Sequence, residues 1–309
     1  MAYLFVHFRE TYGEEGEQVY FSLSKDGYTW SMVNNGEAVL VASKGDMGVR
    51  DITITRTLDN KFVILATDLA LRKNEATKYE GNIRNAFKKG SKCIAMWKSD
   101  DLVNWSEEML VDLSDNRLGC LWAPGIFYDE VGEEFIIHWS STCKEEDYSG
   151  LSIYYSRTKD FEEFTAPELF YKKQDSEVLD SCIVKSNDIY HFFVKSAGNP
   201  LAVIHETSAS LLGPYVRDEH FDEQMDLLEK KGKYEAPTVF TLPDGKICLL
   251  MDYYGCEKKE EQGYVPFLMD SLDEVQLNLA KDKFQFPYGF KHGVVLEITD
   301  AEYDRIQLG

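Results

Sequence analysis

An internal repeat is the feature of this sequence that most constrains its fold. Four segments share one plan, in which an apolar strand is followed by a short acidic or glycine-containing turn and a second apolar strand. They are residues 50–68, 122–139, 179–196 and 235–252. Aligned on Ile54, Ile126, Ile183 and Val239, the segments are 72, 57 and 56 residues apart. Repeats of this length that contain several short strands are typical of the blades of a β-propeller.

The number of blades follows from the length of the chain, because 309 residues at about 62 per repeat give five blades. A fifth inner strand is absent from the N-terminal half, and residues 291–298 supply it. We therefore predict an all-β, five-bladed β-propeller in which the C-terminal strand joins the N-terminal blade, residues 3–41, and closes the ring. Residues 1–309 are interpreted as a single catalytic domain, with the polar insertion 69–92 as a mobile surface loop.

A third strand also recurs, followed by an aspartate and, four residues later, by an aromatic side chain. The pairs are Asp26 and Trp30, Asp101 and Trp105, and Asp160 and Phe164. This spacing predicts a hairpin turn with the aromatic ring packed behind it.

Composition excludes several classes of protein. The formal net charge of −21 argues against nucleic-acid or anionic-membrane partners, because phosphate binding needs a dense basic surface. No run of 18 apolar residues is present, so we expect no membrane span. The six cysteines are scattered without a C-x-x-C pair, which favours reduced thiols over a zinc site or disulfides. The N-terminal residues lack the pattern of a secretory signal, so we expect a cytoplasmic protein.

Polar residues occur where the inner strands of a propeller should converge on the central channel. The matching register positions are Asp51, Ala123, Asp180, Ala236 and His292, and Glu235 directly precedes Ala236. Three carboxylates from three blades would meet there, although burying an unpaired charge is costly. Glycoside hydrolysis is one reason to place carboxylates there. It needs a carboxylic acid that protonates the leaving oxygen and a second carboxylate on the other side of the sugar. A third carboxylate would raise the pKa of the acid.

Over nearly its whole length the sequence resembles glycoside hydrolase family 43, five-bladed propeller enzymes that cut arabinofuranosides and xylosides. The most specific segments are residues 49–54, 122–124, 179–184 and 235–240, in this order and spacing. The resemblance implies that Asp51 is the general base, that Glu235 is the general acid, and that Asp180 modulates the pKa of the acid and orients it. It also implies inversion of configuration, with base and acid about 6.5–9.5 Å apart.

Two further residues are expected to bind substrate. His292 matches a histidine that members of the family place near the channel, often beside a water-coordinated calcium ion, so a metal contact through water is implied. Trp122 could stack on a sugar ring, and packing within its blade is an equal alternative. No organic cofactor is expected, because the chain contains neither a glycine-rich phosphate loop nor a G-x-S-x-G motif.

The sequence departs from the family pattern at three positions. Ile52 stands where proline is usual, Gly125 where an acidic residue is common, and Lys291 where arginine is frequent. None of these changes removes one of the three carboxylates, but Gly125 removes a possible contact to the sugar.

The predicted function is the release of terminal α-L-arabinofuranose or β-D-xylose from short oligosaccharides derived from hemicellulose such as xylan, with the choice between these pentoses left open. An alternative is a non-catalytic propeller that binds carbohydrate or another protein, since a fold does not fix a function. Another is a retaining glycosidase such as a fructan-cleaving enzyme, for which the two carboxylates would lie about 5–5.5 Å apart.

Overall fold

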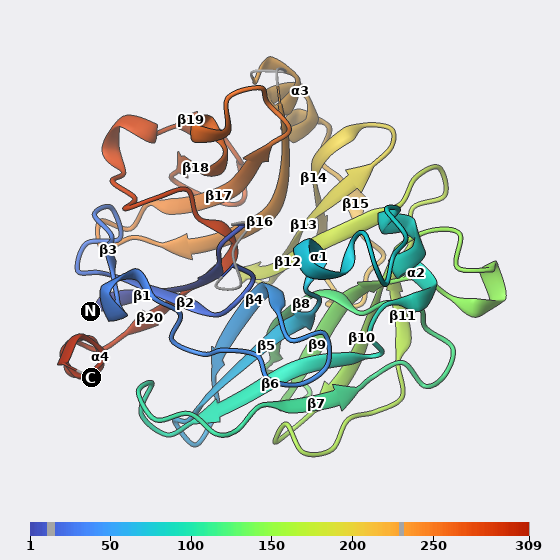
Figure 1. Cartoon of the computed structure of the whole chain (residues 1–309). Helices are drawn as coiled ribbons and strands as arrows, with labels where there is room; N and C mark the ends of the chain where they lie inside the picture. Colours follow the sequence, from blue (N-terminus) through green and yellow to red (C-terminus); the bar gives the residue numbers. More distant parts are fainter. Residues whose placement is uncertain (11–15, 229–231, 309) are drawn as a thin grey trace.

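Five antiparallel sheets of four strands each are arranged as blades around a central channel (Figure 1). The computed structural model describes residues 1–10, 16–228 and 232–308. The inner strands contact one another in the ring order β20, β4, β8, β12 and β16, and the fifth contact returns from β16 to β20. The structure therefore confirms the predicted five-bladed propeller.

The strands of each blade follow one another in sequence, apart from β20. The first sheet contains β1 (Ala2–Phe8), β2 (Tyr20–Ser24), β3 (Ser31–Met32) and β20 (Lys291–Ile298). The second contains β4 (Val49–Arg56), β5 (Phe62–Asp68), β6 (Cys93–Ser99) and β7 (Met109–Asp112). The third contains β8 (Trp122–Asp129), β9 (Glu134–Ser141), β10 (Ser152–Thr158) and β11 (Glu168–Tyr171). The fourth contains β12 (Val178–Ser186), β13 (Ile189–Ala197), β14 (Leu201–Ser208) and β15 (Val216–Arg217). The fifth contains β16 (Lys233–Thr241), β17 (Ile247–Tyr254), β18 (Gly263–Met269) and β19 (Asn278–Leu279).

The helices are short and lie outside the blades. The α-helices are α1 (Leu71–Asn74), α2 (Ala86–Lys89), α3 (Glu219–Leu227) and α4 (Asp300–Leu308). The 3-10 helices are η1 (Asn34–Gly36), η2 (Ile83–Asn85), η3 (Lys144–Glu146), η4 (Lys259–Glu261) and η5 (Lys281–Lys283). In the part of the chain that the structure describes, no helix has the length and apolar character needed to cross a membrane.

The two ends of the chain meet in the first blade. β20 pairs with β1 in antiparallel register, with Phe5 opposite Val295, and β1 pairs in turn with β2. The Met1 ammonium lies 3.2 Å from the Asp300 carboxylate at the start of α4, the C-terminal helix. The C-terminal strand thus closes the ring as the sequence predicts, and it supplies the inner strand of the first blade.

Apolar side chains pack mainly between neighbouring blades. Five large clusters of buried residues each join two adjacent sheets. One of them brings Leu65 of the second blade against the fully buried Trp139 of the third. Because each blade buries its faces against both neighbours, the position of every inner strand depends on the whole ring.

The predicted aspartate turns are present and their hydrogen bonds explain the spacing. Asp101 Oδ1 accepts the backbone N–H groups of Val103 and Asn104 at 2.9 and 2.7 Å. The Trp105 ring packs against the core behind the turn, and its Nε1–H donates to the Leu102 carbonyl. Equivalent turns are formed at Asp26 and Asp160.

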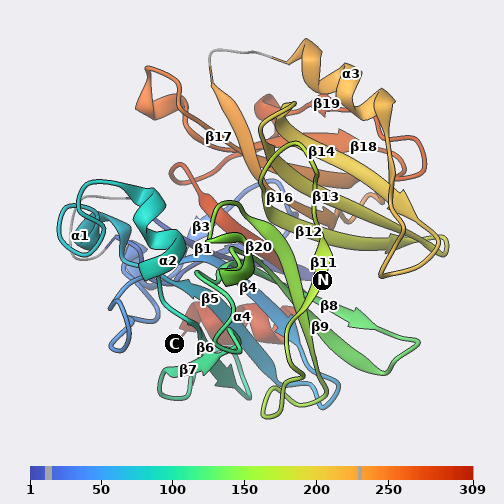
Figure 2. The ribbon, with the colours of Figure 1, turned by 90° about the vertical axis from the view of Figure 1, so that its right-hand side faces the viewer.

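The insertion 69–92 is a folded segment, and not the mobile loop that its polarity suggested. It contains α1, η2 and α2, and it buries Tyr79, Ala86 and Phe87. Figure 2 shows α1 and α2 at the left edge of the molecule, beside the second sheet. Polarity gave the wrong expectation because three apolar side chains are enough to fix a short helical segment on an existing surface.

Inner strands bend at one shared position, which is the register position singled out from the sequence. The hydrogen-bonded pairing of the inner strands β4, β8, β12 and β16 shifts register there, as expected for a β-bulge. At these bulges the backbone is left-handed, with φ of 50° at Asp51, 49° at Ala123, 53° at Asp180 and 46° at Ala236. Non-glycine residues adopt this conformation at a cost, and they do so mostly at functional sites.

Gly125 provides space for a buried histidine and not a sugar contact. It lies opposite His138 in the β8–β9 ladder, and a Cβ atom on Gly125 would lie 2.2 Å from the His138 ring. His138 is 1% exposed and its Nδ1 is 2.8 Å from Ser181 Oγ on β12, so the ring cannot move aside freely. An acidic side chain at position 125 would collide with this ring.

We therefore predict that Gly125→Ala destabilises the protein by about 1–3 kcal/mol through overpacking. Gly150→Ala is the matched control, because a Cβ there meets only Glu177 Cγ at an ordinary 3.6 Å. Urea unfolding followed by tryptophan fluorescence measures both. Equal stability of the two variants would contradict the packing role of Gly125.

Candidate active site

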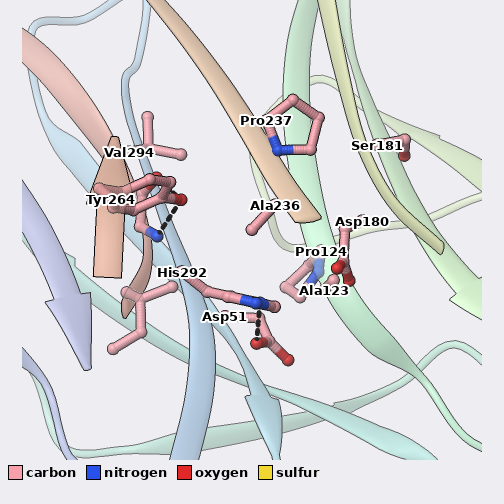
Figure 3. Close-up of a pocket in the computed structure, with 12 residues that line it drawn as sticks. Asp51, Ala123, Pro124, Asp180, Ser181, Ala236, Pro237, Tyr264, His292 and Val294 are labelled. Atoms are coloured by element: carbon pink, nitrogen blue, oxygen red, sulfur yellow. Dashed lines mark hydrogen bonds and ion pairs between the residues drawn. The ribbon is translucent and has the colours of Figure 1, made fainter. Parts of the chain in front are cut away.

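Asp51 lies on the bulge of β4 and points into the channel, where it meets His292 (Figure 3). Its Oδ1 atom is 2.6 Å from His292 Nδ1, and its Oδ2 atom accepts a hydrogen bond of 2.9 Å from Thr67 Oγ1. Burial raises the pKa of Asp51, but the charge and hydrogen bond of His292, with Arg50 and Thr67, outweigh it and lower the pKa below its usual value. Asp51 is therefore ionised at neutral pH, as a general base must be.

Glu235 is held by two cationic groups. Its Oε1 atom lies 3.0 Å from His292 Nε2, and its Oε2 atom accepts a hydrogen bond from the Lys195 ammonium group. Burial raises the pKa of Glu235, yet His292 and Lys195 together bring it far below the usual value. We expected a neighbouring carboxylate to raise this pKa. In the structure, two cations outweigh that effect, and Glu235 is an anion in this arrangement.

Asp180, on the bulge of β12, is the one of the three predicted catalytic carboxyl groups whose pKa is raised. The side chain is 6% exposed, and its Oδ2 atom has no hydrogen-bond partner among the described residues. Burial raises the pKa of Asp180 to about 6, the nearby Glu235 charge adds to this, and His292 opposes it. Asp180 therefore keeps a proton to higher pH than either of the other two carboxyl groups.

His292 lies among all three carboxylates. Its two ring nitrogens face Asp51 and Glu235 on opposite edges of the ring, so the ring keeps these carboxylates apart. Burial lowers the pKa of His292, but the charges of Asp180 and Asp51 and the bonds to Asp51 and Glu235 raise it well above 6.5. The ring is thus a doubly protonated imidazolium at neutral pH.

Asp51, Asp180 and His292 border a cavity of about 40 Å³, and Glu235 directly precedes Ala236, which also lines it. All five register positions predicted from the sequence line it: Asp51, Ala123, Asp180, Ala236 and His292. A void of this size can hold ordered water, for which about 10–15 Å³ is sufficient. Remote parts of the chain are therefore brought to one point, as the alignment of the repeats indicated.

Trp122 directly precedes Ala123, which lines the cavity. The ring is half-buried and packs edge-on against Phe87 of the insertion, with ring centroids 5.5 Å apart and an interplanar angle of 69°. This contact supports the packing alternative for Trp122, and its stacking on a sugar stays a prediction.

Sequence reasoning missed Lys195 and Asp252, which belong to a set that we call the support residues: Thr67, Ser140, Lys195 and Asp252. Each occupies the same place near the end of the second strand of its blade, opposite the residue that directly precedes the bulge. For Asp252 that residue is Glu235. Each also contacts the inner strand of the following blade. Polar residues at the end of an apolar second strand in all four repeats were the available signal.

The contacts of the support residues are specific. Thr67 Oγ1 accepts the Ala123 N–H at 2.7 Å, and Ser140 Oγ accepts the Asp180 N–H at 3.2 Å. Lys195 donates to Glu235, as described above. Asp252 Oδ1 accepts a hydrogen bond of 3.0 Å from the Lys291 ammonium group. Polar contacts thus link neighbouring blades. On the following blade they involve a residue of the bulge, Glu235, or the residue before His292.

Asp252 is a fourth buried carboxylate in the site. It is fully buried, and its Oδ2 atom lies 3.6 Å from His292 Nε2. Burial raises the pKa of Asp252 to about 6, against the lowering effects of Lys291 and His292. Lys291, where arginine is frequent in the resembled family, therefore neutralises this group.

Asp180, Glu235 and His292 could together hold a metal ion. One ligand atom from each lies within 4.8 Å of the others, and the buried Asp180 Oδ2 atom lacks a partner. Two carboxylates and one imidazole suit a divalent cation, and calcium would need further oxygen ligands, such as water. Because Nε2 of His292 faces Glu235 as a donor, direct ligation by this nitrogen would require loss of its proton. The residues thus fit a cation in exchange for the imidazolium proton.

Comparison with known proteins identifies the class of this chain. A family described as a probable glycosyl hydrolase domain, related to glycoside hydrolase family 43, matches residues 1–304, and the chain belongs to it. An α-L-arabinofuranosidase from Bifidobacterium longum subsp. longum is 26% identical over 203 residues. The match covers 60% of this chain and 18% of that protein, so the chain spans less than a fifth of the length of this relative.

Solved structures share the fold at low identity. A putative exo-β-1,3-galactanase from Bifidobacterium bifidum superposes with a TM-score of 0.62 and 13% identity, over 92% of this chain and 89% of that chain. An α-L-arabinofuranosidase from Podospora anserina superposes with a TM-score of 0.55 and 17% identity, over 82% and 79% of the two chains. These structures support the five-bladed fold, and the family match makes the chain a probable glycoside hydrolase.

We predict that Lys291→Met destabilises the protein by about 3 kcal/mol, because it removes the cation that hydrogen-bonds to the fully buried Asp252 and leaves only the more distant His292 to oppose its charge. The loss should grow as the pH rises through about 6, where Asp252 ionises, and shrink below that pH, where a protonated Asp252 needs no partner. Lys246→Met is the control, since its partner Asp270 is 89% exposed and such pairs contribute little. Urea unfolding at pH 5 and pH 8 would contradict the prediction if both variants behaved alike.

Proposed function

We propose that this protein releases terminal pentose, either α-L-arabinofuranose or β-D-xylose, from hemicellulose-derived oligosaccharides with inversion of configuration. The observation that carries the proposal is the placement of Asp51 and Glu235 on opposite edges of the His292 ring, with Asp180 beside them. Membership of a glycosyl hydrolase family supports hydrolysis, and the name of the Bifidobacterium longum relative supports a pentose.

In this proposal, Asp51 accepts a proton from a water molecule as its oxygen attacks the anomeric carbon. The bond from that carbon to the leaving oxygen breaks, and the leaving oxygen takes a proton from the acid. An inverting enzyme needs about 6.5–9.5 Å between the two carboxyl groups to accommodate this water, and a retaining enzyme only about 5–5.5 Å. The imidazole ring between Asp51 and Glu235 favours the wider separation and thus inversion.

The proton for the leaving group is held beside Glu235. His292 Nε2 lies 3.0 Å from Glu235 Oε1, a hydrogen-bond distance at which the imidazolium can pass its proton to the carboxylate. Asp180 acts on this proton because its charge raises the pKa of His292. We therefore assign Asp180 the role of holding the shared proton near Glu235, which extends its predicted role as the modulator of the acid.

A non-catalytic, carbohydrate-binding propeller is the second candidate. One observation favours it, namely that both oxygens of Glu235 are already engaged by His292 and Lys195. Substitution of the two carboxylates separates these functions, because a binding protein has no turnover to lose.

We expect Asp51→Asn and Glu235→Gln each to lower kcat/KM by at least about a hundredfold, since general acid–base groups contribute on that scale. The assay uses aryl α-L-arabinofuranoside, aryl β-D-xyloside and aryl β-D-galactoside, with NMR detection of the first-formed anomer. Glu163→Gln, an exposed carboxylate far along the third blade, is the control. Near-normal turnover in both site variants would rule out the assigned roles, and a retained anomer would rule out inversion.

We expect a bell-shaped pH profile of kcat/KM, with the acidic limb set by ionisation of Asp51 and the basic limb by loss of the shared proton. Asp180→Asn should shift the basic limb to lower pH, because the negative charge that raises the pKa of His292 is removed. The acidic limb should move little. A basic limb that stays in place would contradict the role assigned to Asp180.

A further inference from the structure

The insertion 69–92 reaches from the second blade past the third blade to the fourth. Arg84 of η2 belongs to the insertion between β5 and β6 of the second blade, whereas Glu177 directly precedes β12 of the fourth blade. Arg84 Nη1 lies 2.7 Å from Glu177 Oε1. Because the third blade stands between these two in the ring, this ion pair spans the whole inner end of one blade.

Beneath this ion pair, aromatic rings fill the space down to the channel. The Arg84 guanidinium lies 5.2 Å from the centre of the Phe87 ring, and Phe87 packs edge-on against Trp122 at 5.5 Å. Phe87 is buried in a cluster to which Trp122 and Leu179 also belong. Trp122 precedes Ala123 and Leu179 precedes Asp180, so the cluster ends one residue away from two positions that line the cavity.

Two hydrogen bonds, one buried and one part-buried, hold the insertion in this place. Thr142 Oγ1 of the third blade donates to the Phe87 carbonyl at 2.6 Å, in a buried position. The fully buried Tyr79 places its hydroxyl 3.0 Å from Asp46 Oδ2. The insertion is therefore a fixed part of the site in this structure.

We propose that Arg84, Phe87 and Trp122 form a wall that determines substrate length, by closing the sugar site on the side of the third blade so that only the end of an oligosaccharide can enter. This proposal rests on the proposed function and adds the residues that would make the protein exo-acting. In this proposal, a chain that continued on both sides of the cleaved bond would meet Phe87 and Trp122, which pack together one residue from Ala123 of the cavity. A terminal sugar needs only one open side.

The two ends of the wall differ in their expected effect on folding. Arg84 is 62% exposed, and exposed ion pairs contribute little to stability. Phe87 is 7% exposed, so its truncation removes core contacts as well. Arg84→Ala therefore tests the wall without loss of fold, and Phe87→Ala tests it with the larger opening.

The experiment compares Arg84→Ala and Phe87→Ala with Lys89→Ala. The control breaks a pair of similar length, Lys89 with Glu80 at 2.6 Å, which lies within the same insertion and spans no blade. Substrates are the aryl pentoside and pentose oligosaccharides of two to six units, including hexamers whose non-reducing end is blocked. We expect kcat/KM for the blocked hexamers, relative to the aryl pentoside, to rise about tenfold in both wall variants and to stay unchanged in the control.

Other results overturn the proposal. A uniform loss on all substrates would mean that the wall is only structural, and an unchanged ratio in both variants would exclude a role in substrate length. If the parent protein hydrolyses none of the substrates, the proposed function fails and the wall is tested by calorimetry on the same oligosaccharides. The wall variants should then gain affinity for the blocked hexamer relative to the dimer, and an unchanged affinity ratio would refute the wall.

Discussion

A single imidazolium makes the arrangement of this site possible. Asp51, Asp180, Glu235 and Asp252 lie on three inner strands and one second strand. Asp180 and Asp252 are buried and the other two are half-buried, and close carboxylates in a medium of low polarity repel one another strongly. The His292 ring lies within ion-pair distance of Asp51, Glu235 and Asp252. Its charge also lowers the pKa of Asp180. Its positive charge does in this chain what a bound cation would do, and the same residues could exchange its proton for such an ion. The proposed chemistry uses that proton.

The propeller fold delivers these groups through two repeated devices. A bulge with left-handed backbone at one register position re-aims a residue of each inner strand from β4 to β16. A support residue on each second strand then contacts the next inner strand, so that the support from one blade positions the chemistry of the following one. The strained backbone persists because each inner strand packs against the inner strands of both neighbouring blades.

Much of the fold and of the candidate site could be predicted from the sequence, because residues at equivalent positions of a repeat occupy equivalent positions in the blades. The common spacing of the four segments gave the blade count, the closing strand and the register positions, and the structure places all five at one cavity. Lys195 and Asp252 were missed because alternation of apolar and polar residues shows which face a residue occupies, but not which blade it reaches. The direction of the Glu235 pKa was missed for the same reason, since it depends on the Lys195 cation of another blade. The packing of residues 69–92 depends on a receiving surface that no local pattern describes.

The closing of the ring by β20 has a consequence for how the site comes into being. Strands β4, β12 and β16 carry Asp51, Asp180 and Glu235, and all three precede His292 along the chain. During synthesis on a ribosome, these acidic groups therefore emerge before the histidine that faces them. Until β20 is added, Arg50 and Lys195 relieve the repulsion among the carboxylates only in part. Maturation of the site and pairing of β20 with β1 are thus one event.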